Sequence, residues 1–293
     1  MPVQRLPIIG HPLSDSPSEA VLRAAIEAAG LPIEIERWER RPHQLRDAIA
    51  ELKGKDFAGA ILASPHKEKA AGLVGALSDD ARTSGAVNVI VRDGERLRGH
   101  NTDVDGVRAG LAAILPRVKG KWPRQAVVLG AGGGARAVVA VLLGSGFQHV
   151  AVFNRHLHRA EALVSHFSRS ARHMELRARP WHDAIIEAEL SRAPLLVNAS
   201  GPGTDSDRST IPGELLPAEL YLLDLALQQA VTPLMAEVTE RGGTVGNGQA
   251  AFLAASAATF RLLTRDEASP EPMRAALAAE LGVPPADVAI VVD

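Results

Sequence analysis

Cysteine is absent from this chain of 293 residues, and aromatic residues make up only 3% of it. The first absence excludes disulfides, thiol nucleophiles and thiolate metal sites, and it is consistent with a reducing cytoplasm. The second means that the core must be built mainly from Ala, Val, Leu and Ile. An excess of one charge is also lacking, since 32 Lys and Arg stand against 34 Asp and Glu. This balance gives no reason to expect a nucleic acid or an anionic membrane as a partner.

Long apolar runs are missing as well. The first residues, MPVQRLPIIGHP, contain no apolar stretch of signal-peptide length, and no segment approaches the length of a membrane span. We therefore expect a soluble, cytoplasmic protein. With 46% hydrophobic residues over 293 positions, the chain is long enough for two ordinary globular domains.

Residues 125–146 carry the pattern that best predicts a fold. The apolar run 126–129 is typical of a buried parallel strand, and Gly130, Gly132 and Ala135 follow it with G-x-G-x-x-A spacing. Gly130 permits a tight turn into a helix, Gly132 lets the backbone approach a pyrophosphate, and Ala135 keeps helix and strand close. The beginning of the helix offers free N–H groups and a positive dipole end to the phosphates.

A glycine-rich loop can also be a plain turn, so its surroundings decide. An Ala- and Val-rich helix follows this loop, and a second strand is expected over residues 149–153. Strand, turn, helix and next strand together predict a dinucleotide site. The remaining residues of the predicted loop are Ala131, Gly133 and Gly134.

The end of the second strand indicates which dinucleotide is bound. An NAD site usually has Asp or Glu about 20 residues after the glycines, whereas Arg accommodates the 2′-phosphate of NADP. This chain has Asn154 and Arg155 there, then Arg159, and no acid before Glu161. The pattern favours NADP, with Arg155 binding the phosphate. The alternative is that Arg155 and Arg159 form a solvated pair at the start of a helix.

Alternating strands and helices predict a two-domain α/β fold. Strands are expected at residues 6–9, 33–38, 59–62, 126–129, 149–153, 195–199 and 221–225, with a hairpin around Asp93 and Gly94 between 87 and 97. Helices are expected at residues 18–29, 42–52, 66–74, 104–115, 157–167, 233–241 and 248–263. We predict a substrate domain over residues 1–104, completed by helices in 248–293, and a doubly wound Rossmann domain over 105–247. The basic, Pro-containing segment 116–124 would connect the two.

Four polar stretches of the first domain lie where turns meet helices or strands. They contain Ser16 and Ser18 ahead of a helix, Lys67, Asn88 on an expected strand, and Asp103 before a helix. Three of them have a purely structural alternative. Ser16 and Glu19 have the spacing of a capping box, Lys67 can be a solvated surface lysine, and Asp103 can be an N-cap.

Taken together, these stretches and the glycine loop resemble the shikimate dehydrogenase family over nearly the whole chain. The family's motifs match Gly10, Pro12, Ser16 and Ser18, Pro65 and Lys67, the Gly-Ala-Val-Asn at 85–88, the Gly-x-Asn-Thr-Asp at 99–103, GAGGGARA, Asn154 and Arg155, and, as Asn-Ala-Ser, residues Asn198, Ala199 and Ser200. The resemblance implies reversible hydride transfer between NADPH and a cyclic keto carboxylic acid, in aromatic amino acid biosynthesis through the chorismate pathway. It also implies a small-molecule substrate and a candidate homodimer.

The resemblance assigns roles to the polar residues. A Lys67–Asp103 pair would act at the carbon being reduced, because an ammonium group can stabilise the negative charge on the carbonyl oxygen and donate a proton to it. Asn88 would exchange hydrogen bonds with a substrate hydroxyl. Ser16 and Ser18 would bind the carboxylate, and residues 198–200 would lie near the nicotinamide.

Four positions depart from the family's pattern, and all become less polar. The family's Asn and Thr before Pro-x-Lys are Ile61 and Ala63, its Tyr is Leu227, and its late helical Gln is Ala255. These changes indicate a member of the family with an altered substrate, such as a less hydroxylated analogue of shikimate. The alternatives are a dehydrogenase of quinate or another cyclic hydroxy acid, or a catalytically silent NADP-binding sensor.

Overall fold

The computed structural model describes residues 2–13, 17–94, 96–115, 123–201 and 209–288. The chain forms two compact units. Unit 1 contains Met1–Gly106 and Leu253–Ile290, and unit 2 contains Val107–Phe252. Each unit has its own sheet of six strands, so the predicted two-domain α/β class is confirmed.

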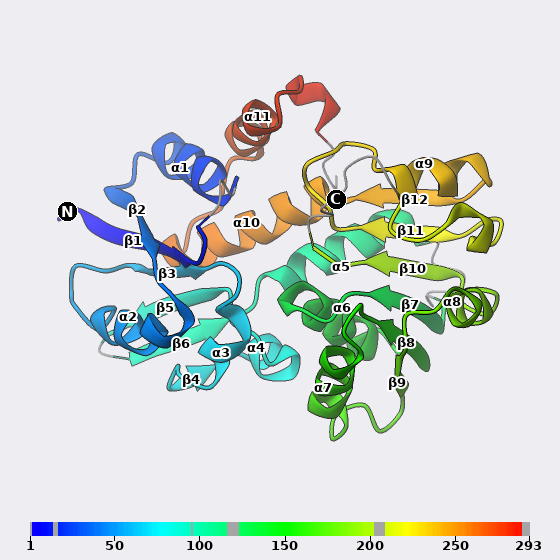
Figure 1. Cartoon of the computed structure of the whole chain (residues 1–293). Helices are drawn as coiled ribbons and strands as arrows, with labels where there is room; N and C mark the ends of the chain where they lie inside the picture. Colours follow the sequence, from blue (N-terminus) through cyan, green and yellow to red (C-terminus); the bar gives the residue numbers. More distant parts are fainter. Residues whose placement is uncertain (1, 14–16, 95, 116–122, 202–208, 289–293) are drawn as a thin grey trace. The chain divides into compact units, whose positions relative to one another are not determined.

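The sheet of unit 1 is mixed, with strand order β2-β1-β3-β5-β6-β4 (Figure 1). Its strands are β1 (Gln4–Gly10), β2 (Ile33–Glu39), β3 (Gly59–Leu62), β4 (Ala76–Leu77), β5 (Val89–Asp93) and β6 (Arg96–His100). Strands β1, β2 and β3 are parallel, while β5 runs antiparallel to both β3 and β6. The predicted hairpin is confirmed, and Gly94 in its turn has a φ of 60° that favours glycine.

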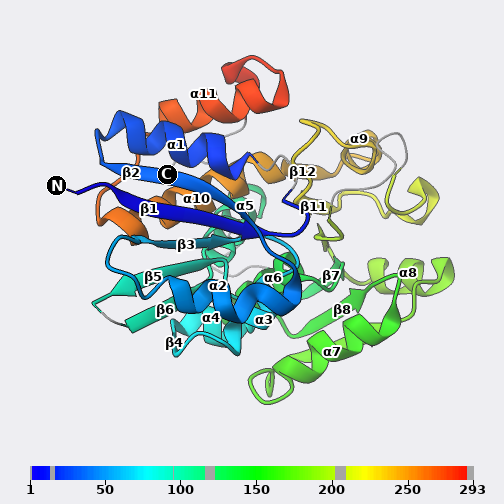
Figure 2. The ribbon, with the colours of Figure 1, turned by 60° about the vertical axis from the view of Figure 1, so that its left-hand side comes forward.

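Helices cover both faces of this sheet. They are α1 (Ser18–Ala28), α2 (Leu45–Glu51, after a 3-10 turn at Pro42–Gln44), α3 (Lys67–Ala71), α4 (Asp79–Ser84), α10 (Gly248–Thr264), which starts in unit 2, and α11 (Pro270–Leu281). Ala60 and Leu62 of β3 belong to a core cluster with Leu45 of α2. Because side chains alternate along a strand, Gly59 faces the other way, where its missing Cβ would lie 3.0 Å from Leu263 of α10. Helices α1 and α11 lie side by side (Figure 2).

The capping-box alternative at the start of α1 depends on Ser16, which lies outside the described residues. The N-cap residue is Pro17, which has no side chain to accept a hydrogen bond. The Glu19 carboxylate instead accepts hydrogen bonds from Arg23 at 2.8 Å and Arg37 at 3.3 Å. Ser16 and the greater part of the predicted connecting segment, residues 116–122, lie outside the described residues.

The sheet of unit 2 is entirely parallel, with strand order β12-β11-β10-β7-β8-β9. Its strands are β7 (Gln125–Leu129), β8 (His149–Phe153), β9 (Glu175–Arg179), β10 (Leu195–Asn198), β11 (Tyr221–Asp224) and β12 (Thr244–Asn247). The chain winds outward from β7 to β9, then returns to β10 and winds outward to β12. This doubly wound order places the topological switch point between β7 and β10, where such sheets bind ligands at their carboxyl ends.

Helices pack on both faces of this sheet too. Helices α8 (Asp183–Leu190) and α9 (Pro233–Glu240) share a core cluster with Val127 and Leu222. The opposite face meets α5 (Asp103–Ile114), since a Cβ at Gly110 would lie 3.0 Å from Leu223. Helices α6 (Gly133–Gly144) and α7 (Leu157–Phe167) complete the unit.

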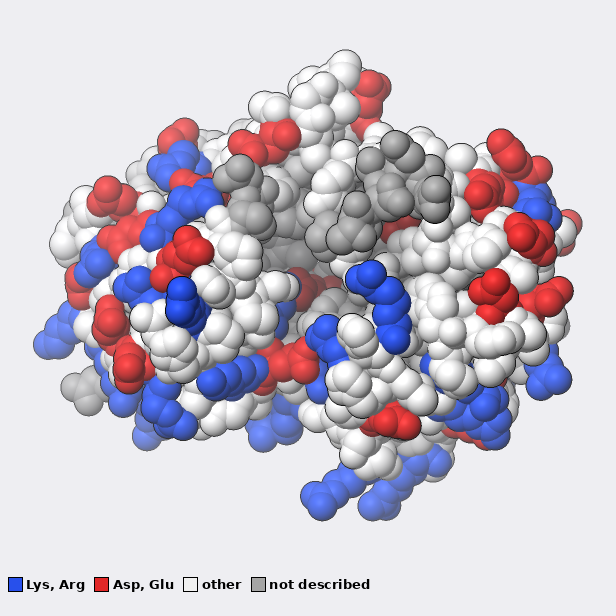
Figure 3. Space-filling model, in the orientation of Figure 1, with Lys and Arg blue, Asp and Glu red and all other residues white. Residues whose placement is uncertain are grey.

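None of the described helices has the length and hydropathy that a membrane span requires. On the face of the molecule in view in Figure 3, positive and negative side chains are interspersed over both units.

Candidate active site

Lys67 and Asp103, which both belong to unit 1, meet at the beginnings of two helices. Lys67 is the first residue of α3, and Asp103 is the first residue of α5. The Nζ atom of Lys67 lies 2.6 Å from Oδ2 of Asp103, and the two side chains are 24% and 21% exposed. The pair is therefore a charge-assisted hydrogen bond that solvent, or a ligand, can reach.

Asn88 holds the other side of Asp103. Its Nδ2 donates to Oδ1 of Asp103 and to Oγ1 of Thr102, each at 2.9 Å, and its Oδ1 accepts the Thr102 N–H at 2.8 Å. The amide orientation is fixed because a backbone N–H needs an oxygen and a carboxylate needs a donor. Both N–H bonds of the amide are thus used inside the protein, and only acceptor capacity remains on Oδ1. This differs from the expectation that Asn88 donates to a substrate hydroxyl.

Asn88 also stands just ahead of β5 and not within it, as the sequence had suggested. Its backbone is nevertheless paired as in a ladder, since its N–H donates to His100 at 3.0 Å and its carbonyl accepts from Leu62 at 2.8 Å. The neighbouring Asn101 is held by Ser84, whose Oγ accepts from Nδ2 of Asn101 at 2.8 Å. The loop that carries Asp103 is therefore fixed from both sides by buried amides.

The loop between β7 and α6 has the geometry that a pyrophosphate needs. Gly130 has a φ of 107°, and a Cβ there would lie 2.3 Å from the carbonyl oxygen of Ala199, so glycine is required twice over. Gly132 is the N-cap of α6 and offers no side-chain acceptor to the first N–H groups of the helix. A Cβ at Gly132 would meet nothing within 4 Å, so the space beside the helix start is open.

The segment after β8 carries the predicted phosphate ligand. Arg155 is exposed, and its guanidinium group has no hydrogen bond or ion pair with any residue in the described parts of the chain. Asn154 donates from Nδ2 to the carbonyl of His156 at 2.9 Å and so fixes the turn. Arg159 is exposed in the first turn of α7. A cation after the second strand with no partner among the described residues fits the 2′-phosphate of NADP.

Comparison with known proteins places the chain in a family. Residues 8–90 match the model of the shikimate dehydrogenase substrate binding domain, and residues 115–240 match that of shikimate / quinate 5-dehydrogenase. The curated shikimate dehydrogenase (NADP(+)) of Symbiobacterium thermophilum is 34% identical over 287 residues, with 97% of each chain covered. The enzyme of the same name from a strain of Thermus thermophilus is 36% identical over 95% of this chain and 99% of its own. The chain belongs to the shikimate dehydrogenase family.

A solved member of the shikimate dehydrogenase family has the same fold. The crystal structure of shikimate 5-dehydrogenase from another strain of Thermus thermophilus, in complex with NADP(H) and shikimate, has a TM-score of 0.79 and 32% identity to this chain. It covers 95% of this chain and is itself covered completely, at 100%. The likeness therefore includes both units.

The segment that corresponds to the family's Asn-Ala-Thr is held by polar contacts. Asn198 is buried and donates from Nδ2 to Asp224 at 3.0 Å and to Thr210 at 3.3 Å, while its Oδ1 accepts from Oγ of Ser200 at 2.7 Å. These bonds fix the turn after β10, whose Ala199 carbonyl abuts Gly130. The structure thus places residues 198–200 beside the glycine loop within unit 2.

The four positions that depart from the family's pattern differ in exposure. Ile61 is 8% exposed, on the face of β3 that looks toward α10, while Ala63 just after β3 is partly exposed. Ala255 is partly exposed on α10, and Leu227 is partly exposed in unit 2 after β11. Ser18 begins α1, and its predicted companion Ser16 is not among the described residues. Ala63 therefore offers more surface to a ligand than Ile61 does.

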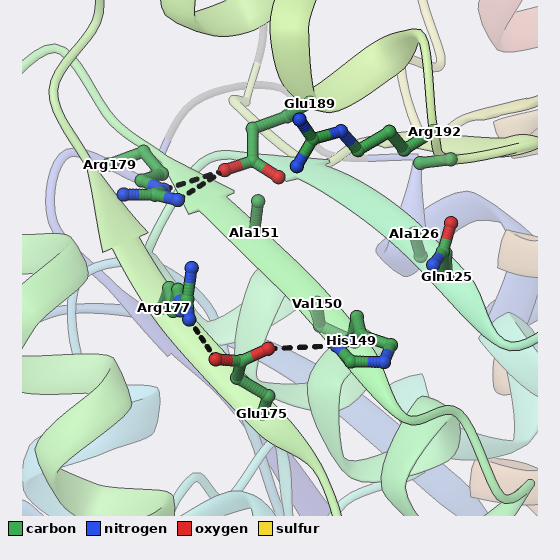
Figure 4. Close-up of a pocket in the computed structure, with 11 residues that line it drawn as sticks. Gln125, Ala126, His149, Val150, Ala151, Glu175, Arg177, Arg179, Glu189 and Arg192 are labelled. Atoms are coloured by element: carbon green, nitrogen blue, oxygen red, sulfur yellow. Dashed lines mark hydrogen bonds and ion pairs between the residues drawn. The ribbon is translucent and has the colours of Figure 1, made fainter.

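A hollow of about 300 Å³ lies elsewhere on unit 2 (Figure 4). Its charged lining is largely paired, since His149 and Arg177 both contact Glu175, and Arg179 donates to Glu189 at 2.7 Å. None of the predicted site residues is among the described residues that line it. The hollow is separate from the glycine loop.

His66, which precedes Lys67, is fully buried and predicts an acid-sensitive fold. Its Nε2 lies 2.7 Å from the carbonyl oxygen of Arg40, and its Nδ1 has no partner among the described residues. Burial lowers the pKa of His66 below its usual value. The neutral imidazole of His66 contributes its full stability above a pH of about 6.5, where this imidazole is neutral in the unfolded chain as well. That contribution is lost as the pH falls, because the unfolded chain binds the proton more readily than the folded chain does.

We therefore expect the free energy of unfolding to decrease between about pH 7.5 and about pH 5.5, and to decrease less in His66→Gln. Burial also lowers the pKa of His100, so part of the decrease should remain in that variant. The measurement is urea denaturation at both pH values, with the exposed His173→Gln as control. An identical decrease in wild type and His66→Gln would contradict the assignment.

Proposed function

We propose that this chain is an NADP-dependent oxidoreductase that transfers hydride reversibly between NADPH and a cyclic keto carboxylic acid. The substrate is 3-dehydroshikimate and its product shikimate, or a less hydroxylated analogue of that pair. The contact of 2.6 Å between Lys67 and Asp103 carries this proposal. It is supported by relatives that are named shikimate dehydrogenase (NADP(+)) and match nearly the whole chain.

Lys67 and Asp103 are the proposed catalytic residues. NADPH supplies the hydride when bound. As negative charge develops on the carbonyl oxygen of the substrate, the Lys67 ammonium group stabilises it and donates a proton to that oxygen. Asp103 accepts a hydrogen bond from Lys67 and keeps the amine directed, while Asn88 holds Oδ1 of Asp103. In the reverse direction Lys67, as the neutral amine, takes the proton from the hydroxyl group.

The remaining candidates are proposed as binding residues. Ser16 and Ser18 would bind the substrate carboxylate, and Ala63, Leu227 and Ala255 would line the substrate's ring. The loop of residues 130–135 and the start of α6 would hold the pyrophosphate, because its N–H groups are uncapped and Gly132 leaves open space. Arg155 would bind the 2′-phosphate with Arg159 beside it, and residues 198–200 would lie near the nicotinamide.

Replacing Arg155 with Ala should raise the apparent Kd of NADP more than about tenfold while leaving that of NAD nearly unchanged. The guanidinium group of Arg155 has no partner among the described residues. The contact that the substitution removes would therefore be the one with the 2′-phosphate of NADP. Isothermal titration calorimetry with NADP and with NAD measures the two dissociation constants. Arg169→Ala, which replaces an exposed arginine just after the end of α7, is the control. An equal loss for NADP and NAD would mean that Arg155 does not recognise the 2′-phosphate.

A quinate dehydrogenase is the second candidate function. It is favoured by the second family match, which covers shikimate and quinate 5-dehydrogenases together. The steady-state rate of NADPH consumption over a panel of cyclic keto acids distinguishes the shikimate from the quinate function. The preferred substrate is the one with the highest kcat/KM. No consumption with any member of the panel would overturn the proposed function.

We also propose a homodimer in the cytoplasm. The absence of cysteine supports the cytoplasmic location. Light scattering after size-exclusion chromatography tests the dimer. A molar mass equal to the 30.9 kDa of one chain would overturn it.

A further inference from the structure

Thr259 connects helix α10 to the residues that hold Asp103. Its Oγ1 lies 2.8 Å from Oγ1 of Thr102, although the two residues are 157 positions apart in the sequence. Thr102 is 1% exposed and Thr259 is 4% exposed, so water does not compete for this contact. No motif of the sequence pointed to Thr259.

The hydrogen bonds of the two hydroxyl groups run in one direction only. Thr259 donates its single proton to the carbonyl of Ala255 at 2.9 Å. It must therefore accept from Thr102, because a hydroxyl group has one proton and two lone pairs. Thr102, having given its proton to Thr259, can only accept from Asn88, as the distance of 2.9 Å to Nδ2 indicates. A directed chain thus runs from Asn88 through Thr102 and Thr259 to the backbone of α10.

This series of hydrogen bonds determines how Asn88 orients its amide group toward Asp103. One N–H bond of Nδ2 is directed at Thr102, and the planar amide then directs the other at Oδ1 of Asp103. Without an acceptor at position 259, the buried Thr102 hydroxyl group has no described acceptor for its proton and is no longer held in one orientation. The bond that fixes the Asn88 amide would then weaken, and the carboxylate would lose part of its alignment with Lys67.

We propose that Thr259 is a positioning residue for the Lys67–Asp103 pair, acting through Thr102 and Asn88. The role in catalysis rests on the proposed function, whereas the effect on Lys67 itself does not. Thr259 touches neither Lys67 nor Asp103 in any described contact, so its effect must pass through the chain of hydrogen bonds.

Thr259→Val removes the hydroxyl group and keeps the shape of the side chain. We expect kcat to fall about tenfold, with KM changed by less than about threefold, because the substrate's own contacts remain. Thr259→Ser should restore kcat. Thr259→Ala repeats the test without the added methyl group, should valine not be accommodated beside Thr102.

Thr264 provides a matched control. It lies on the same helix and donates to the carbonyl four residues earlier, Phe260, at 2.9 Å, but it has no described contact with Thr102. Thr264→Val should leave kcat unchanged. Equal losses in Thr259→Val and Thr264→Val, or no rescue by Thr259→Ser, would overturn the proposal, because a general weakening of α10 would then explain the result.

A second measurement does not depend on turnover. The rate at which acetic anhydride modifies Lys67 can be followed by mass spectrometry against Lys69, which lies on the same helix and bonds the carbonyl of Pro42 at 2.7 Å. We expect the ratio of the two rates to change severalfold in Thr259→Val and to return in Thr259→Ser. An unchanged ratio overturns the positioning role. If the ratio changes but the unmodified protein reduces no cyclic keto acid, the positioning role stands and the proposed function is wrong.

Discussion

Lys67→Ala should lower kcat by about a hundredfold or more, the usual scale for removing a positioned acid. The variant loses both the proton donor and the positive charge opposite the developing oxyanion. It also leaves the Asp103 carboxylate, 2.6 Å from Nζ in the native chain, with its charge unpaired. Steady-state kinetics on the preferred cyclic keto acid measures the effect.

The position of Lys67 sets two controls for this prediction. The glycine loop belongs to unit 2 and Lys67 to unit 1, so the Kd of NADP should be unchanged in Lys67→Ala. Lys69→Ala removes another lysine from the same helix and should keep near-normal turnover, since Lys69 bonds a backbone carbonyl on the surface. Near-normal turnover in Lys67→Ala itself would require the proposed mechanism to be abandoned.

Shikimate should be a poor substrate, with kcat/KM lower than that of the preferred substrate by roughly two to four orders of magnitude. Each missing hydrogen bond to a buried hydroxyl costs about 1–3 kcal/mol, and four polar residues of the family's pattern are apolar here. Two such losses at the substrate are enough for the expected effect. The preferred substrate would keep the carboxylate and carry fewer hydroxyls or an apolar substituent on the ring.

Ala63 is the position at which this prediction is best tested. It is partly exposed, so a hydroxyl group added there by Ala63→Thr can reach solvent or a ligand. Ile61→Asn would instead place an amide at a position only 8% exposed and should destabilise the fold. Ala63→Thr should raise kcat/KM on shikimate more than on a dehydroxylated analogue.

Ala63→Val is the matched control, because it adds the same bulk without the hydroxyl group. It should not improve turnover of shikimate. If the unmodified chain turns over shikimate as efficiently as a biosynthetic dehydrogenase, the altered-substrate proposal is wrong, while the Lys67–Asp103 mechanism stands.

Local sequence patterns predicted most of the interior elements. The strands β3 and β8 and the helix α7 begin and end where the pattern placed them, since buried strands are apolar runs and α7 has a clear apolar stripe. The edge strands β9 and β12 were missed. β9 reads Glu-Leu-Arg-Ala-Arg and β12 reads Thr-Val-Gly-Asn, so neither has the apolar run of a central strand. Only pairing with the strand beside them, β8 and β11, identifies them as strands.

The glycine loop could be predicted from the sequence because the backbone there tolerates only certain residues. Gly130 has a positive φ, and a Cβ added there would lie 2.3 Å from the carbonyl oxygen of Ala199. Only glycine fits both conditions, so a glycine at this position indicates the backbone conformation. The motif around Lys67 and Asp103 also identified both residues, through its resemblance to a known family.

The way in which those residues are held depends on the folded chain. Asn88 was expected to serve the substrate, yet both of its N–H bonds are used on Thr102 and Asp103. Thr259 had no signal at all, because a hydroxyl group on an Ala-rich helix acquires a role only when folding brings it 2.8 Å from Thr102. Side-chain hydrogen bonds depend on distances between segments far apart in the chain, and no local pattern encodes those distances.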